Sequence, residues 1–98
     1  MDKPAWVVMQ LDKVNDRFWL PLVENANDKN VEDVGNTLVV TLKVKSYSLE
    51  DHQFIPTKLD ALGGSELVVL LPRSIVKTIV EGKTDLRAAF SFAGSKLK

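Results

Sequence analysis

The chain has 98 residues, of which 45% are hydrophobic, and it contains no cysteine. This length and composition predict one globular domain spanning residues 1–98, and they exclude disulfides and cysteine-ligated metal sites. The 13 basic and 13 acidic residues give a formal net charge of zero, which counts against nucleic acid as a partner because phosphate binding usually needs a basic excess.

The N-terminal residues Met1-Asp2-Lys3-Pro4 are charged and lack the apolar run of a signal peptide. No stretch of the chain reaches the roughly 18 consecutive apolar residues of a membrane helix. The lack of cysteine also fits a reducing compartment. We therefore expect a cytoplasmic protein that does not enter a membrane.

Two apolar segments are predicted strands in the first half of the chain. Trp6 to Leu11 is the first strand, and after the polar turn Asn15-Asp16-Arg17 its hairpin partner is Phe18 to Leu20. Thr37 to Lys45 is the clearest strand, because its apolar and polar residues alternate with period two. Between them, Pro21 suits the first turn of a short helix, whereas the asparagines that follow favour a loop.

The middle of the chain predicts a second pair of strands. Leu67 to Leu71 is continuously apolar, which is typical of a strand covered on both faces. Gln53 to Leu59 is its expected extended partner, and Pro56 limits that segment to an edge or a bulge. The pair Gly63-Gly64 fits a tight turn between the two strands.

The segment after Pro72 is predicted to be a short helix. Ser74 is a suitable N-cap and Gly82 suits the position just beyond the C-terminus. Ile75, Val76, Ile79 and Val80 share one helical face, although their β-branched side chains also suit a strand. A further alternating strand is expected from Leu86 to Phe92.

The two halves of the chain repeat the same order of features. In both, a hairpin ending in Leu-Pro precedes a short segment, a glycine and an alternating strand. We therefore predict two pseudo-repeats, at about residues 5–45 and 54–94, that close around one core. The expected fold is mainly β, a small closed or pseudo-barrel of two β-hairpin–helix–β repeats with one or two short capping helices.

This unit resembles the double-split β-barrel, or swapped-hairpin barrel, of AbrB-like and MazE-like transcription factors. The resemblance is closest to an uncharacterised family of small prokaryotic domains in which one chain carries both repeats. Leu67 to Val76 and Asp85 to Gly94 resemble the first half of that family, and Arg17 to Pro21 with Asp33 to Lys45 resemble its second half. The halves stand here in permuted order. The resemblance implies a fold and not an activity.

Three aromatic residues are candidates for contact with a ligand or a partner. Trp6, Phe18 and Trp19 fall within the first predicted hairpin, and Phe18 and Trp19 would face opposite ways on a strand. One of the two is then expected to be exposed, and an exposed aromatic suits binding. The alternative is that the aromatics cover a small core.

Four basic residues are candidates for DNA contact in the alternative interpretation, that of an AbrB/MazE-type regulator or antitoxin-like protein. Lys13, Arg17, Arg73 and Lys77 lie near the first turn and the expected helix starts. In the AbrB-like group the helix usually carries arginine four places after the proline. Asn25 and Val76 occupy these positions here, so the chain departs from that pattern.

The remaining polar residues give no strong catalytic pattern. Asp12 and Asp60 occupy matched positions and would form a carboxylate pair if the repeats brought them together. His52 is the only histidine, and the stretch Asn25 to Asp33 lacks the glycine of a calcium loop.

The sequence therefore predicts a non-enzymatic binding or interaction module without a cofactor or metal. Its expected partner is a small molecule or a protein, and its expected state is a monomer or a homodimer. The expected contact surface is the groove between the repeats or an exposed aromatic residue.

Overall fold

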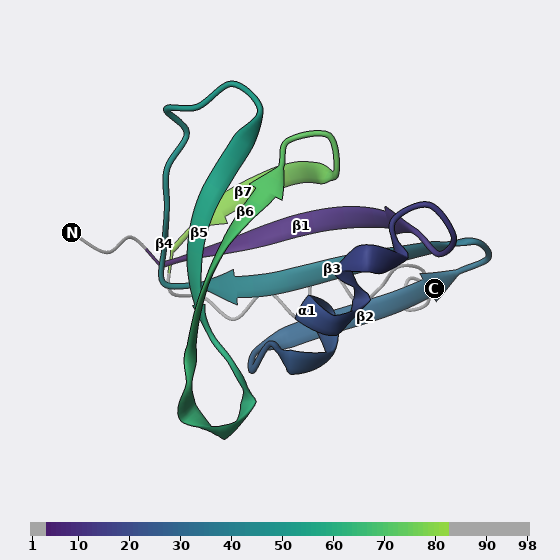
Figure 1. The fold of residues 1–98 in the computed structure, drawn as a ribbon, viewed down its shortest axis with the longest axis horizontal. Helices are drawn as coiled ribbons and strands as arrows, with labels where there is room; N and C mark the ends of the chain where they lie inside the picture. Colours follow the sequence, from purple (N-terminus) through teal and green to yellow (C-terminus); the bar gives the residue numbers. More distant parts are fainter. Residues whose placement is uncertain (1–3, 83–98) are drawn as a thin grey trace.

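A computed structural model describes residues 4–82 as a mainly β fold with two antiparallel sheets (Figure 1). The elements in chain order are β1 (Ala5–Asp12), the 3₁₀ helix η1 (Arg17–Trp19), α1 (Leu20–Asn25), β2 (Lys29–Val34), β3 (Thr37–Val44), β4 (Ser46–Tyr47), β5 (Phe54–Asp60), the 3₁₀ helix η2 (Leu62–Gly64), β6 (Glu66–Pro72) and β7 (Val76–Glu81). The strand expected from Leu86 to Phe92 lies outside the described residues. Within residues 4–82, no helix is long and apolar enough to span a membrane.

The larger sheet has the strand order β2-β3-β1-β7, with β1 hydrogen-bonded on both sides. Alternation along β1 sends Ala5, Val7, Met9 and Leu11 into the core, where they are fully buried. On β3, Val40, Leu42 and Val44 face the same way and are buried as well. The predicted strands at Trp6–Leu11 and Thr37–Lys45 are thus confirmed.

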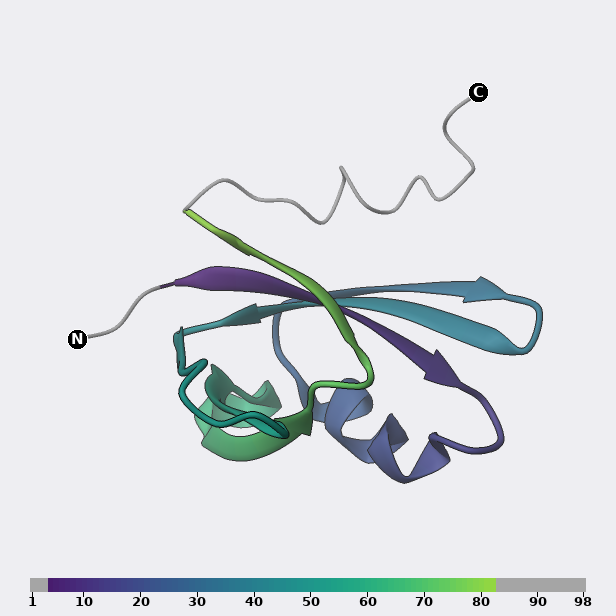
Figure 2. The ribbon, with the colours of Figure 1, turned by 90° about the horizontal axis from the view of Figure 1, so that it is seen from above.

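The smaller sheet has the order β4-β5-β6 and lies on the core side of the larger one (Figure 2). Its inward residues Ile55, Leu59 and Leu71 join the main core cluster. The predicted pairing of the segment around Pro56 with Leu67–Leu71 is confirmed, with Pro56 opposite Leu70. On the other side of β5, β4 pairs with Thr57 and Lys58, and the N–H of Ser48 donates to the carbonyl of Pro56 at 3.1 Å. The missing N–H of Pro56 therefore falls at the end of this short ladder.

The first predicted hairpin is wrong. Phe18 to Leu20 does not pair with β1; η1 begins at Arg17 and continues into α1 at Leu20. Pro21 lies in the first turn of α1, where its fixed φ and missing N–H are tolerated. The sequence left open a helix or a loop after Pro21, and the structure has a helix there. Leu22 and Val23 are buried on its apolar side.

The helix predicted after Pro72 is also wrong, because Val76–Glu81 forms strand β7 at the edge of the larger sheet. Trp6 lies opposite Val80 in this pairing, and the N–H of Gln10 donates to the carbonyl of Ile75 at 2.9 Å. β-Branched side chains prefer strands, and pairing with β1 satisfies the second edge of that central strand. The helical spacing of the apolar residues was therefore misleading.

Strand β6 is not covered on both faces as expected. Val68 and Leu70, on its outward face, are 69% and 54% exposed. Only Leu71 of this strand is fully buried. The uninterrupted apolar run therefore reflects one face toward the core and one face toward solvent.

The described strands form two separate sheets, and no closed barrel is present within residues 4–82. An isolated bridge pairs Ala26, after α1, with Ala61, after β5. This arrangement places the end of α1 beside the tip of the β5–β6 hairpin. Both hollows described below depend on that placement.

Candidate functional site

Two hollows lie where the first half of the chain meets the second. The first, which we call the charged pocket, is lined by Pro4, Asp28, Lys43, Val44, Lys45 and Asp60. The second, which we call the α1–hairpin groove, is lined by Pro21, Leu22, Asn25, Ala61, Leu62, Ser65, Leu67 and Val69. Residues from both halves of the chain line each of them, and a contact surface between the halves stays a prediction.

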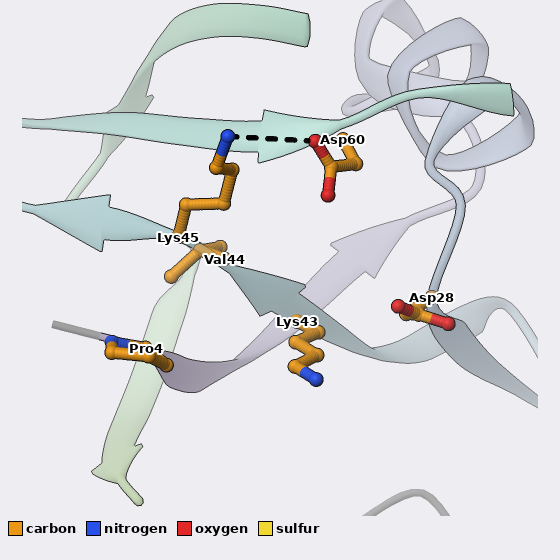
Figure 3. Close-up of a pocket in the computed structure, with 6 residues that line it drawn as sticks. All are labelled: Pro4, Asp28, Lys43, Val44, Lys45 and Asp60. Atoms are coloured by element: carbon orange, nitrogen blue, oxygen red, sulfur yellow. Dashed lines mark ion pairs between the residues drawn. The ribbon is translucent and has the colours of Figure 1, made fainter. Parts of the chain in front are cut away.

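The charged pocket has a volume of about 260 Å³. Figure 3 shows the six residues that line it. The end of β3 supplies its lysines, the segment between α1 and β2 supplies Asp28, and the end of β5 supplies Asp60. The backbone holds these segments together, because the N–H of Lys43 donates to the carbonyl of Asp28 at 3.0 Å. The N–H of Lys45 donates to the carbonyl of Lys58 at 2.7 Å.

The ammonium group of Lys45 forms ion pairs with carboxylates of the same chain. Its Nζ lies 3.8 Å from Oδ1 of Asp60 and 2.7 Å from Oε2 of Glu66. The hydrogen bond from Lys45 holds the pKa of the Glu66 carboxyl below its ordinary value. The polar side chains among the described residues of the lining are the ammonium groups of Lys43 and Lys45 and the carboxylates of Asp28 and Asp60. Its charges join the two sheets.

The α1–hairpin groove is the larger and more apolar hollow, with a volume of about 370 Å³. Leu67 and Val69 form part of it from the inward face of β6, and both are only half-buried. Leu62, at the hairpin tip, is 52% exposed. The polar side chains in the lining are Asn25 and Ser65.

The local sequence determines where the two walls of the groove lie. On one wall, Pro21 starts α1, and the side chain of Asn25 donates to the carbonyl of Pro21 at 2.8 Å. On the other wall, Gly63 and Gly64 have φ of 84° and 90°, a region that residues with a Cβ rarely adopt. The N–H of Asn27 donates to the carbonyl of Asp60 at 2.9 Å and fixes the distance between the walls.

The three aromatic candidates occupy different environments. Trp6 is 2% exposed within the larger sheet, so it offers a partner almost no surface. Trp19 is partly buried and packs against the core, whereas Phe18 is 79% exposed. The rings of Phe18 and Trp19 meet edge to face with centroids 5.4 Å apart. Of the three candidates, Phe18 is therefore the one that exposes most of its side chain.

The four basic candidates are not arranged as an uninterrupted basic stripe. Lys13 pairs with Asp33 at 2.5 Å. Arg73 donates from Nε to the carbonyl of Asp51 and from Nη2 to the carbonyl of Leu49, both at 2.9 Å. Lys77 lines a polar hollow together with Asp12 and Asp16. Arg17 opens η1 and is exposed.

Asp12 and Asp60 line different hollows and have different partners. Oδ1 of Asp12 accepts hydrogen bonds from the N–H groups of Val14 and Asn15, each at 2.8 Å. These bonds, with that from Asn15 the larger cause, lower the pKa of the Asp12 carboxyl. Asp12 thus shapes the turn after β1 and does not form a carboxylate pair with Asp60.

His52 is exposed in the segment before β5, and it makes no hydrogen bond or ion pair with another residue of the range 4–82. Among residues 4–82, no group of three or more His, Cys, Asp or Glu side chains is placed to hold a metal ion.

Sequence reasoning missed the residues of the α1–hairpin groove. Leu62, Leu67 and Val69 carry no motif, and they read as ordinary turn and core residues. The apolar Leu62 between Ala61 and the two glycines was the one available signal, because turn tips are usually polar.

No family model matches the chain, and neither the curated proteins nor the solved structures give a match.

Proposed function

We propose that the protein is a non-enzymatic interaction module that binds an apolar segment of a protein partner in the α1–hairpin groove. The observation that carries this proposal is the open apolar lining of the groove, with Leu62, Leu67 and Val69 incompletely buried. Burying one medium-sized apolar side chain contributes about 1.5–3 kcal/mol. Singly exposed apolar residues are common on folded domains, but apolar surface gathered in one concave place is typical of a binding site.

The composition of the groove favours a peptide over a small charged metabolite. Its volume of about 370 Å³ suits a few side chains. Asn25 and Ser65 provide hydrogen-bonding groups for the backbone of a bound segment. Phe18, in the helical turn that runs into α1, does not line the groove, but it is an exposed aromatic residue of the kind enriched in interfaces.

The experiment is selection of peptides from a random library against the purified protein, followed by affinity measurement with two matched variants. Leu62→Asp places a charge in the groove lining. Leu49→Asp makes the same change at a leucine that is 51% exposed, against 52% for Leu62, and that does not line the groove. Selected peptides should be apolar, and their affinity should fall about tenfold or more for Leu62→Asp only.

Amide chemical shifts locate the bound peptide independently of these substitutions. Shifts concentrated at α1 and the β5–β6 hairpin would support the proposal. Failure to select any peptide, or affinities that fall equally for both leucine variants, would contradict it.

The closed barrel and its two repeats stay predictions. The second repeat of a double-split barrel was expected to have a helix where the structure has β7. A double-split barrel would therefore need residues 86–92 to complete that repeat. DNA binding remains a prediction as well, and a gel shift with random duplex at low salt tests it. The ion pair of Lys13 and the carbonyl contacts of Arg73 do not support it.

A further inference from the structure

Strand β6 is an edge strand with apolar side chains on both faces. Among the strands of residues 4–82, its one neighbour in the sheet is β5. Val68 and Leu70 are exposed on the outward face, and Leu67 and Val69 are half-buried on the inward face. Edge strands are usually protected by charge, proline or a covering element. Here Glu66 and Pro72 stand only at the two ends of the strand.

The backbone of β6 has hydrogen-bonding groups available along this edge. The N–H of Arg73 donates to the carbonyl of Gln53, and the N–H of Ala61 donates to the carbonyl of Ser65, so odd-numbered positions face β5. The backbone groups of Glu66, Val68 and Leu70 therefore point away from β5. None of them has a backbone partner within the described part of the chain.

We propose that a second copy of this chain occupies the β6 edge, so that the two β6 strands pair antiparallel about a twofold axis at Val69. In this register Val68 exchanges backbone hydrogen bonds with Leu70 of the second copy, and Leu67 lies opposite Leu71. The two small sheets then become one continuous sheet in the order β4-β5-β6-β6-β5-β4. This inference does not depend on the proposed peptide binding.

The sequence of β6 favours its own copy as the occupant because the strand is self-complementary. With the axis at Val69, each of the five apolar residues from Leu67 to Leu71 lies opposite another apolar residue. Shifting the axis to Val68 would place Glu66 opposite Leu70, and shifting it to Leu70 would place Leu67 opposite Arg73. Pro72 has no N–H, so it ends the ladder near Glu66 of the second copy.

Charge at the strand ends also favours the antiparallel arrangement. Glu66 precedes the apolar run and Arg73 follows it. Antiparallel pairing brings the acidic end of one strand beside the basic end of the other, whereas parallel pairing would bring like charges together. The twofold interface is isologous, which is the commonest form of homodimer contact.

Pairing at β6 would also extend the α1–hairpin groove. Val69 lines the groove and lies at the proposed axis. The grooves of the two copies would therefore meet across the axis, and each copy would supply a wall for the other. A bound segment could then contact both subunits.

The absence of cysteine from the chain allows a register-specific test. In the proposed register the two Val69 residues form a non-hydrogen-bonded pair with Cα atoms about 4.5 Å apart, which is within the range of a disulfide. Val69→Cys should form a covalent dimer under mild oxidation. Val68→Cys and Leu70→Cys should cross-link much more slowly, because each lies opposite the other position.

Sedimentation velocity over a wide range of protein concentration provides a second test that does not depend on cysteine. The dimer should weaken by about tenfold or more in Leu70→Lys. Val34→Lys is the matched control, because Val34 is also 54% exposed on the edge strand β2 of the other sheet, and it should leave the dimer unchanged.

A wild-type protein that remains monomeric at every concentration, with no cross-linking of Val69→Cys, would overturn the inference. So would a dimer that is insensitive to Leu70→Lys and cross-links faster through Val68→Cys. The peptide selection with Leu62→Asp reads a different property, so this inference and the proposed function can fail separately.

Discussion

The Nζ atom of Lys45 lies 2.7 Å from Oε2 of Glu66, and this ion pair joins the end of β3 to the start of β6. It is one of the direct side-chain links between the two sheets. Its effect on Glu66 gives the first prediction.

Lys45→Met should raise the pKa of the Glu66 carboxyl toward its ordinary value, because the hydrogen bond from Lys45 is the largest cause of the lowering. Lys43→Met, two residues earlier, is the control and should leave the Glu66 pKa almost unchanged. The measurement is an NMR pH titration of the Glu66 side chain at low salt. Equal shifts in the two variants would disprove the role of the pair.

The same pair predicts a change of stability with pH. The pKa of Glu66 is lower in the folded state, so its stabilising contribution is fully present above the unfolded value of about 4.3. That contribution is lost as the pH falls through the folded pKa. Urea unfolding at a series of pH values should show a shallower acid slope for Lys45→Met than for the wild type.

The hydrogen bond from Tyr47 to Glu81 predicts a delayed titration of the phenol. Tyr47 Oη donates to Oε2 of Glu81, and this bond raises the pKa of Tyr47 above its usual value of about 10. Tyr47 is the only tyrosine, so ultraviolet absorbance follows it alone. Glu81→Gln should bring the midpoint down. Because the folded pKa is raised, the associated stability is lost as the pH rises through it.

Two leucines three residues apart test where the core ends. Leu59 on β5 is fully buried, whereas Leu62 at the hairpin tip is half exposed. Leu59→Ala should lower the free energy of unfolding by about 2–5 kcal/mol, and Leu62→Ala by no more than about 0.5 kcal/mol. Chemical denaturation measures both. Similar losses for the two would mean that the hairpin tip is packed more tightly than described.

The turn between β2 and β3 depends on glycine. Val34 pairs with Thr37 across Gly35-Asn36, and Gly35 has a φ of 65°. No atom lies within 4 Å of a Cβ added at Gly35, so the cost of Gly35→Ala should come from backbone conformation alone and amount to about 1–2 kcal/mol. Gly35→Asn should cost less, because asparagine tolerates this region better. Thermal unfolding of the two variants gives the comparison.

Sequence reasoning located strands where period-two alternation was long and unambiguous. The strand from Thr37 to Lys45 was predicted almost to the residue. Sequence reasoning failed where a segment was too short for a period to show. Phe18 to Leu20 is such a segment, and it belongs to a helical turn. The prediction also failed at Val76 to Glu81, where pairing with β1 determined the conformation and helical spacing was incidental.

The candidate site was less predictable than the fold because it is formed by segments distant in sequence. The groove needs Pro21 and Leu22 of α1 beside Leu67 and Val69 of β6, and no pattern within either segment encodes the other. For the same reason, the sequence did not show that β6 has exposed side chains on one face and half-buried side chains on the other. A run of apolar residues does not show which of its faces another sheet will cover.

The pairing of Ala5 with Glu81 places the first described strand beside the last. Strand β1 therefore cannot complete its second edge until the segment Val76–Glu81 has been synthesised. Such sequence-distant closure gives a high contact order, and domains of this kind fold in milliseconds to seconds. Until that pairing forms, Met9 and Leu11, which are fully buried in the folded protein, lack part of their covering, and exposed apolar surface of this kind promotes aggregation during folding.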